Sequence, residues 1–402
     1  MSPARRRDRS YDVVLFGATG FTGGLTADYL ARHVPEGTRW AIAGRDVPRL
    51  EAVATRLADH TAGAGSVDVI RADSAEPDSL RSLAEASRVI ASTVGPFMSH
   101  GQLLVAACAR TGTDYLDITG EPEFVDRMWL AHHDTAARNG ARLVHACGFD
   151  SVPHDLGVWF TLGQLPVDQP LSIAGYVRAN ASFSSGTYHS AVRAFGRARH
   201  SAEAARSRRA REVLPKDRRV GSLPLRPRRV PGSRRWAVPL PTIDPIIVRR
   251  SARALDRYGP DFRYGHFADV GALPLAAAGM AGAGGLLAAA QIPPLREALL
   301  KLRSSGAGPD EQRRSESWFR VRFVSTVGGD HAEPILTEVS GGDPGYEETA
   351  KMLAESALSL AFDDDLLPEV TGQLTPVQAM GNALLARLQR AGMIFRTIPG
   401  RR

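Results

Sequence analysis

The first third of the chain alternates short apolar runs with longer stretches in which apolar residues recur at every third or fourth position. The short runs predict buried strands, and the periodic stretches predict helices that bury one face. Strands that alternate with helices at this rhythm form a parallel sheet with right-handed crossovers. The six predicted strands are 11–16, 40–43, 67–71, 89–93, 114–117 and 142–146, and the first two predicted helices are 22–33 and 48–59.

The pattern changes after Pro153, where strands are separated by longer excursions. Such spacing predicts a second, α+β domain built on an antiparallel sheet. Its predicted strands are 171–179, 318–326 and 335–339, with turns at 182–186 and 328–330 and a helix at 346–362. A last helix at 377–391 and a strand at 393–397 complete the chain. The expected division is a disordered basic tail (1–10), a first domain (11–153), a second domain (154–365), and a C-terminal helix and strand (366–402) that return to the first domain.

Charge and hydropathy single out two segments of the second domain. Segment 193–235 holds fifteen Lys or Arg residues against three acidic residues, whereas the whole chain has a net charge of +7. The prolines in it favour an exposed, solvated loop, and a patch for an acidic carrier or for anionic lipid is the alternative. The segment has no zinc-finger spacing and no RNA-binding signature, so nucleic acid is not an expected partner.

Segment 271–292 has no charged residue and is long enough to cross a bilayer, but Ala and Gly dominate it and Pro274 interrupts it. We therefore expect a flexible or buried helical hairpin, with peripheral membrane contact as the alternative. The N-terminal arginines are followed by no apolar stretch of a signal peptide. Only Cys108 and Cys147 occur, which fits a reducing compartment. The expected location is the cytoplasm, alone or at the surface of the plasma membrane.

The strongest chemical motif is the glycine loop 17–23, whose sequence is GATGFTG. It follows an apolar strand and opens a helix, which is the context of a Rossmann-type dinucleotide-binding fingerprint. Glycines there allow a tight turn, close approach of the pyrophosphate, and close packing of helix on strand. A turn without a ligand is the alternative. The residues expected to bind the cofactor here are Gly17, Thr19, Gly20, Phe21, Thr22 and Gly23.

Three further positions bear on the choice of cofactor. Arg45 ends the second predicted strand, where a cation suits the 2′-phosphate of NADP and an acid would suit the ribose of NAD. The adjacent Asp46 weakens that argument, although NADP(H) remains the expected cofactor. Asp73, just after the third strand, is placed to approach the adenine or to cap the following helix.

The loops after the later strands supply the rest of the predicted site. Val94, Gly95 and Pro96 follow the fourth strand and should run beside the cofactor, or else form a plain strand-to-helix turn. Asp117 follows the fifth strand, and Asp150 and Ser151 follow the sixth. We take these last three as the catalytic candidates, because ligands of open α/β sheets bind at the carboxyl ends of the strands. A cap for a helix at 154–160 is the alternative for Asp150 and Ser151.

Several familiar catalytic patterns are absent from the sequence. It contains no HExxH motif, no metal-ligand spacing and no GxSxG elbow, so no metal is expected. The Tyr-x-x-x-Lys pair of many short-chain reductases is missing too. Tyr188 and His189 could donate a proton, but their spacing gives no support for that role. The proton donor is therefore not identified from the sequence.

With these residues in place, the sequence resembles the saccharopine dehydrogenase-like oxidoreductases, and more closely their trans-acting enoyl reductase branch. The resemblance covers nearly the whole chain and rests on the stretches 17–23, 43–45, 93–97, 115–121, 147–157, 184–190, 258–267, 341–358 and 374–395. It implies an NADP-binding Rossmann domain and reduction of a carbon–carbon double bond on a polyketide or fatty-acyl chain. Such an enzyme acts in lipid or glycolipid biosynthesis and supplies a step that a synthase lacks. The arginine-rich 193–235 segment departs from the branch, which leaves substrate and partner open.

Two other functions stay open at this stage. One is a non-catalytic NADP-binding protein on membrane or lipid surfaces, supported by segments 193–235 and 271–292. The other is a saccharopine-type dehydrogenase of an amino-acid-like metabolite. The expected partners are an acyl or polyketide substrate, free or carrier-bound, and a second copy of the chain in a homodimer.

Overall fold

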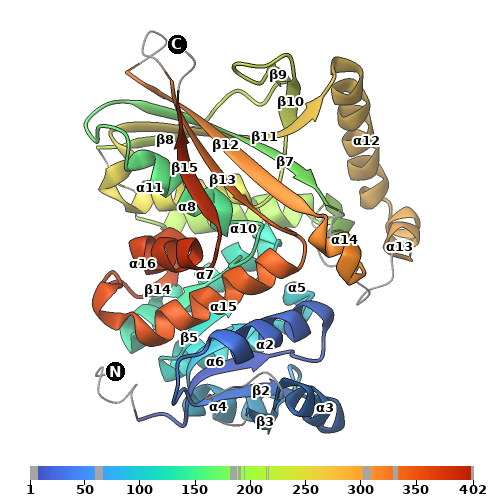
Figure 1. Ribbon diagram of the computed structural model, residues 1–402, viewed down its shortest axis with the longest axis vertical. Coiled ribbons are helices and arrows are strands. Elements are labelled where there is room, and N and C mark those ends of the chain that lie inside the picture. Colours follow the sequence, from blue (N-terminus) through green and yellow to red (C-terminus); the bar gives the residue numbers. More distant parts are fainter. Residues whose placement is uncertain are drawn as a thin grey trace.

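The computed structural model describes residues 8–58, 67–181, 188, 192–193, 195–213, 215, 217–301, 309–328 and 334–399. Two sheets organise these residues (Figure 1). The predicted turn at 182–186, most of the turn at 328–330, and His189 lie outside the described residues.

The first sheet is parallel and confirms the predicted Rossmann-type architecture. Its seven strands lie in the order β14-β6-β5-β4-β1-β2-β3. Alternate residues of the central strand point to opposite faces: Val13 and Leu15 join one core, Val14 and Phe16 the other. The bounds are β1 Tyr11–Phe16, β2 Trp40–Gly44, β3 Asp68–Arg71, β4 Ser87–Ser92, β5 Asp114–Asp117, β6 Arg142–Val144 and β14 Gly372–Leu374.

Helices cover both faces of this sheet. One face carries α2 (Phe21–His33), α3 (Val47–Ala58) and α15 (Glu347–Phe362), and α15 packs on α2 and over β1, β4 and β5. The other face carries α4 (Pro77–Ala86), α6 (Gln102–Thr111) and α7 (Pro122–Asn139). The short α5 (Phe97–His100) lies between β4 and α6 in the chain. Arg9, in the predicted disordered tail, is instead buried and donates to the carbonyl oxygen of Ala84.

The second sheet is mixed, not purely antiparallel as expected. Its eight strands run in the order β15-β13-β12-β7-β11-β10-β9, with β8 paired to β11. The strand β11 is parallel to β7 and β8, and the other pairs are antiparallel. The bounds are β7 Leu171–Asn180, β8 Arg219–Ser222, β9 Arg228–Arg229, β10 Trp236–Pro239, β11 Asp261–Gly271, β12 Trp318–Val327, β13 Ile335–Gly341 and β15 Ile394–Ile398.

The helix α8 (Val152–Leu162) joins the two halves, because it follows the first sheet and packs under β12 and β13 of the second. A Cβ atom at Gly157 would lie 2.4 Å from the ring of Phe323, so the sheet rests directly on the helix backbone. Around it lie α11 (Asp244–Ala254), the 3₁₀ turns Asp256–Tyr258 and Asp364–Leu366, and α14 (Glu311–Ser315).

The C-terminal segment contributes one strand to each sheet. The strand β14 extends the first sheet beside β6, and α16 (Pro376–Arg390) contacts α15 and α8. Thr375 and Gln378 start α16 with a capping box. The final strand β15 then pairs with β13 of the second sheet. The expectation that this last strand returns to the first domain was therefore wrong; β14 and α15 make that return.

The basic segment 193–235 is not one loop, as its composition suggested, although most of its described residues are exposed or partly exposed. Residues 198–211 form α10, which packs on α7. Arg208 and Asp126 pair at 2.6 Å with both side chains buried, and Arg197 pairs with Glu123 of α7 at 2.6 Å. The acidic residues on α7 thus neutralise arginines that the local charge count left unmatched.

The uncharged segment 271–292 forms one helix, α12 (Leu273–Gln291), and not a hairpin. It contacts β10, β11 and the following α13 (Pro293–Lys301), and it stands at one edge of the molecule (Figure 1). Leu275 on this helix is 61% exposed, so the prediction of a buried segment was wrong. Within the described part of the chain, no helix combines the length and the apolar character needed to span a membrane.

Candidate active site

The glycine loop after β1 lies against the loop after β4. Gly17 has φ +105°, a conformation that favours glycine, and a Cβ there would lie 2.7 Å from Thr93 Oγ1. The Thr93 amide donates to the carbonyl oxygen of Phe16 at 2.9 Å, and its hydroxyl donates to the Gly17 oxygen at 3.1 Å. These contacts join the two loops at the carboxyl edge of the sheet.

The two later glycines serve different purposes. A Cβ at Gly23 would lie 2.0 Å from the Gly17 oxygen, so this glycine lets α2 pack directly on the loop. Gly20 is the N-cap of α2 with an ordinary extended backbone, φ −81° and ψ 164°. A Cβ there would meet only the Gly17 oxygen, at 3.5 Å. No neighbour in the described chain thus requires a glycine at this position, and the space beside it is open.

That open space fits a dinucleotide phosphate. The first N–H groups of a helix have no acceptor within it, and with the helix dipole they bind anions. Thr19 and Gly20 are exposed at this N-terminus, and Thr22 is partly exposed. The ring of Phe21 packs edge-on against Tyr346 at 4.8 Å, which anchors the loop to the start of α15. The residues predicted at positions 17–23 therefore form one surface that suits a pyrophosphate.

The residue at the end of β2 is free to take a further phosphate. Arg45 is exposed, and no carboxylate of the described residues pairs with it. The adjacent Asp46 accepts a hydrogen bond from the Arg49 amide at 3.2 Å, at the start of α3. This hydrogen bond gives Asp46 a local structural role. Asp73 accepts from the Ala75 amide at 2.9 Å, so it shapes the turn before α4 and does not sit at that helix's N-cap.

A buried carboxylate that the sequence analysis missed holds the loop after β4. Glu121 accepts from the amides of Phe97 at 3.0 Å and Met98 at 3.1 Å, at the start of α5. Burial raises the pKa of Glu121. The bond between Gly95 and Pro96 is cis. Val94, Gly95 and Pro96 thus lie between the contacts of Thr93 with the glycine loop and the contacts of Glu121 with α5.

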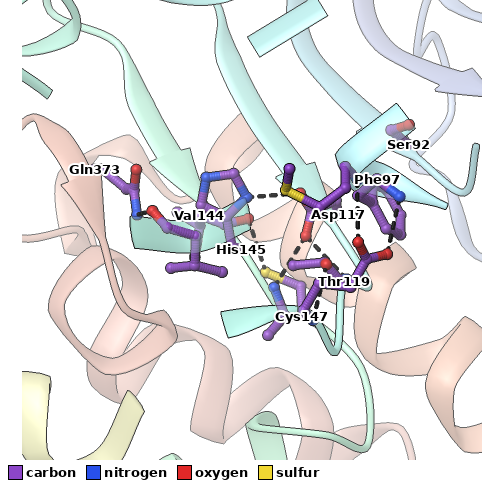
Figure 2. Close-up of polar contacts among 12 residues, drawn as sticks. Ser92, Phe97, Asp117, Thr119, Val144, His145, Cys147 and Gln373 are labelled. Atoms are coloured by element: carbon purple, nitrogen blue, oxygen red, sulfur yellow. Dashed lines mark hydrogen bonds and ion pairs between the residues drawn. The ribbon is translucent and has the colours of Figure 1, made fainter. Parts of the chain in front are cut away.

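Asp117 is the centre of a buried polar network (Figure 2). Its carboxylate accepts from the amides of Thr119 at 3.0 Å and Ala146 at 3.1 Å, and it contacts His145 Nδ1 at 2.6 Å. Ala146 has φ +61°, an uncommon conformation for a side-chain-bearing residue. Asp117 is fully buried, so the geometry gives it a positioning role for the loops after β5 and β6. Its predicted catalytic role gains no support from this arrangement.

The other two catalytic candidates open α8. Ser151 is the N-cap residue, but its hydroxyl forms no cap hydrogen bond and has no partner among the described residues. Asp150 is partly buried. Burial, together with the negative charge of Asp244, raises the pKa of Asp150 to about 7, while His154 opposes the shift. A carboxyl group that holds its proton near neutral pH can act as a general acid.

Beside Asp150 lies a cluster that no sequence spacing revealed. His154 of α8, Asp244 at the start of α11 and His266 of β11 are all buried, and their ligand atoms lie within 4.8 Å of one another. These residues are 90 and 22 positions apart along the chain, so only the fold brings them together. The expectation of no metal-ligand cluster is therefore corrected. Tyr188, by contrast, donates to the Leu299 carbonyl oxygen at 3.0 Å, next to α13.

Comparison with known proteins places this geometry in a family. The model of the saccharopine dehydrogenase NADP-binding domain matches residues 13–144. A protein of Mycobacterium tuberculosis named as a trans-acting enoyl reductase is 37% identical over 97% of this chain and 98% of its own. A trans-acting enoyl reductase of Mycobacterium leprae is 36% identical over 99% of both chains. The chain belongs to the saccharopine dehydrogenase-like family, in its trans-acting enoyl reductase branch.

The solved structures agree on the fold of this family member. The apo saccharopine dehydrogenase (L-Glu forming) of Saccharomyces cerevisiae matches with a TM-score of 0.55 and 13% identity, covering 96% of this chain and 99% of that one. The family model ends at the last residue of β6, so it includes the glycine loop, Arg45 and Glu121. The enzyme is thus an NADP-dependent oxidoreductase of this family. Asp150 and the His154 cluster lie beyond the matched domain.

Proposed function

We propose that this enzyme reduces the carbon–carbon double bond of an α,β-unsaturated acyl thioester on a polyketide or fatty-acyl chain. Its relatives named trans-acting enoyl reductases support this reaction over amino-acid dehydrogenation. The observation that carries the proposal is the position of Asp150, a carboxyl group whose pKa is raised to about 7, at the same sheet edge as the glycine loop. That edge is where an open α/β sheet binds its ligands.

Bound NADPH supplies a hydride for the β-carbon of the substrate. The loop 17–23 and the N-terminus of α2 hold its phosphates, and Arg45 holds the 2′-phosphate. The backbone of Val94–Pro96, braced by Glu121, flanks the reacting ring. Asp150 donates its proton to the α-carbon, which the hydride addition leaves electron-rich, and then regains a proton from water. One hydride and one proton are thereby added across the double bond.

The substrate is proposed to arrive on a carrier and to belong to lipid or glycolipid synthesis. The exposed apolar helix α12 supports this, since it offers a surface for an acyl chain or for a lipid interface. The same helix favours a second proposal, peripheral association of this enzyme with membranes.

Purified enzyme, NADPH and a panel of enoyl thioesters of increasing chain length test the proposed reaction. We expect oxidation of NADPH, followed by absorbance, with enoyl but not saturated thioesters. Turnover should be at or below about 10 per second, the typical enzyme value, because a free thioester lacks carrier contacts. Cofactor binding without oxidation at any chain length would exclude the reductase. Flotation of the protein with anionic vesicles tests the membrane association.

A further inference from the structure

The buried cluster of His154, Asp244 and His266 carries an inference that does not depend on the proposed reaction. Two imidazoles and one carboxylate converge from α8, α11 and β11, and each of the three residues is at most 2% exposed. His154 Nδ1 lies 2.7 Å from Asp244 Oδ1, and His266 Nε2 lies 3.7 Å from Asp244 Oδ2. We propose that these three residues bind one divalent transition-metal ion, with Zn²⁺ as the reference case.

The unsatisfied polar atoms of the cluster are the first support for the site. Both ring nitrogens of His154, Oδ1 of Asp244 and Nε2 of His266 have no hydrogen-bond partner among the described residues. His154 Nδ1 and Asp244 Oδ1 lie 2.7 Å apart, within ion-pair distance, so these two atoms partly satisfy each other, whereas His154 Nε2 and His266 Nε2 are left to a further partner. Buried polar atoms without partners are rare in proteins, because each costs about 1–3 kcal/mol. An ion between the three side chains would satisfy several of these atoms at once.

The charge balance is the second support. Asp244 is a buried carboxylate, and among the described residues no Lys or Arg lies within ion-pair distance of it. A buried charge is stable only when it is paired or coordinates a metal. The ligand types then select the ion: two imidazoles with one carboxylate suit Zn²⁺ or Co²⁺, whereas Mg²⁺ and Ca²⁺ require mainly oxygen ligands.

The surroundings orient one ligand for coordination. The Tyr264 hydroxyl lies 3.1 Å from His266 Nδ1, which leaves Nε2 facing Asp244. A hydrogen bond of this kind, to the ring nitrogen that does not bind the ion, fixes the imidazole of a metal ligand. Two ligand atoms about 2.1 Å from one tetrahedral Zn²⁺ are about 3.4 Å apart. The ligand atoms of the cluster lie within 4.8 Å of one another, and His154 Nδ1 lies 2.7 Å from Asp244 Oδ1. Metal binding therefore requires side-chain rotations that close the wider separations and open this short contact.

The bound ion would link α8, α11 and β11 where the first domain meets the second. His154 lies on the helix that Asp150 precedes, while Asp244 and His266 belong to the second domain. A loaded enzyme should thus be more resistant to unfolding.

The test uses tag-free, full-length protein stripped of metal with a chelator and titrated with Co²⁺. We expect visible Co²⁺ absorption that saturates at one ion per chain, is displaced by Zn²⁺, and accompanies a higher unfolding temperature. The conservative variants His266→Gln and Asp244→Asn should bind at least about 100-fold more weakly. The exposed histidine of α10 provides the matched control, since His200→Gln should bind like the unaltered protein.

Two results would overturn the proposal. One is a wild-type protein that shows no Co²⁺ absorption up to millimolar metal. The other is folded His266→Gln protein, verified by circular dichroism, that binds Co²⁺ as tightly as the wild type. The titration of the wild-type protein tests the proposal by itself. A variant that fails to fold therefore leaves that test valid.

Discussion

At the scale of single residues, two glycines of the loop have different neighbours: Gly20 lies beside open space, whereas Gly23 packs against the Gly17 carbonyl oxygen. Gly20→Val places its side chain in the open space beside α2, so NADPH binding should be lost while the free energy of unfolding changes by less than about 0.5 kcal/mol. Gly23→Ala drives a methyl group into the Gly17 carbonyl oxygen and should lower both binding and stability. Fluorescence titration and urea unfolding measure the two effects. Near-native NADPH affinity in Gly20→Val would mean that the loop is only a turn.

Arg45 decides between the two nicotinamide cofactors. Arg45→Asp removes a charge-assisted contact, worth about 1.5–3 kcal/mol, and adds a repulsion. The Kd for NADPH should therefore rise roughly 10-fold to 150-fold or more, while the Kd for NADH changes little. Arg32→Asp, near the other end of α2, is the charge-matched control. An equal loss for both cofactors would remove Arg45 from the 2′-phosphate site.

Asp150 sets the pH dependence of the proposed reaction. Its raised pKa, about 7, means that the proton-donating form prevails below pH 7 and disappears above it. The rate of a single turnover should therefore fall tenfold per pH unit on the alkaline side. Asp150→Asn should lower the rate about 10²–10⁴-fold at pH 6 and abolish this limb, whereas the exposed Asp168→Asn should do neither. A limb that persists in Asp150→Asn would assign the proton to another group.

At the scale of elements, the docking of α10 on α7 depends on one buried ion pair. Arg208→Ala leaves the Asp126 carboxylate buried and unpaired, which should cost about 3–5 kcal/mol of unfolding free energy. Arg211→Ala, on the same helix, breaks an exposed pair with Asp134 and should cost less than about 1 kcal/mol. Urea unfolding compares the two variants. Equal, small effects would mean that α10 is held by other contacts.

The elements also show what a sequence can and cannot predict. Strands of the first sheet were predictable because each is an apolar run followed by a glycine or polar turn, as at Tyr11–Phe16. The three-residue β14 has no such pattern, and its partner β6 lies about 230 positions earlier. The arginines of α10 suggested a solvated loop because their partners, on α7, are about 75 to 80 positions away. Local charge and hydropathy cannot report contacts at that separation.

The same limit applies to the site across the whole molecule. The glycine loop, Arg45 and the Val94–Pro96 turn are local patterns that follow strands, so their positions at the carboxyl edge of the sheet were predictable. The cluster of His154, Asp244 and His266 joins three segments across the domain boundary, and nothing in their spacing marks it. The sequence placed Asp150 among the catalytic candidates, but its raised pKa comes from burial and from the nearby Asp244, which only the fold supplies.

The central claim, that the whole molecule reduces an enoyl thioester with NADPH, is tested most directly by following the hydride. NADPH deuterated at C4 of the nicotinamide is oxidised by the enzyme with a short enoyl thioester, and the product is analysed by mass spectrometry and NMR. The account predicts one deuterium at the β-carbon and, in deuterated water with unlabelled NADPH, one deuterium at the α-carbon. A saturated product without cofactor deuterium at the β-carbon, or no saturated product at all, would contradict it.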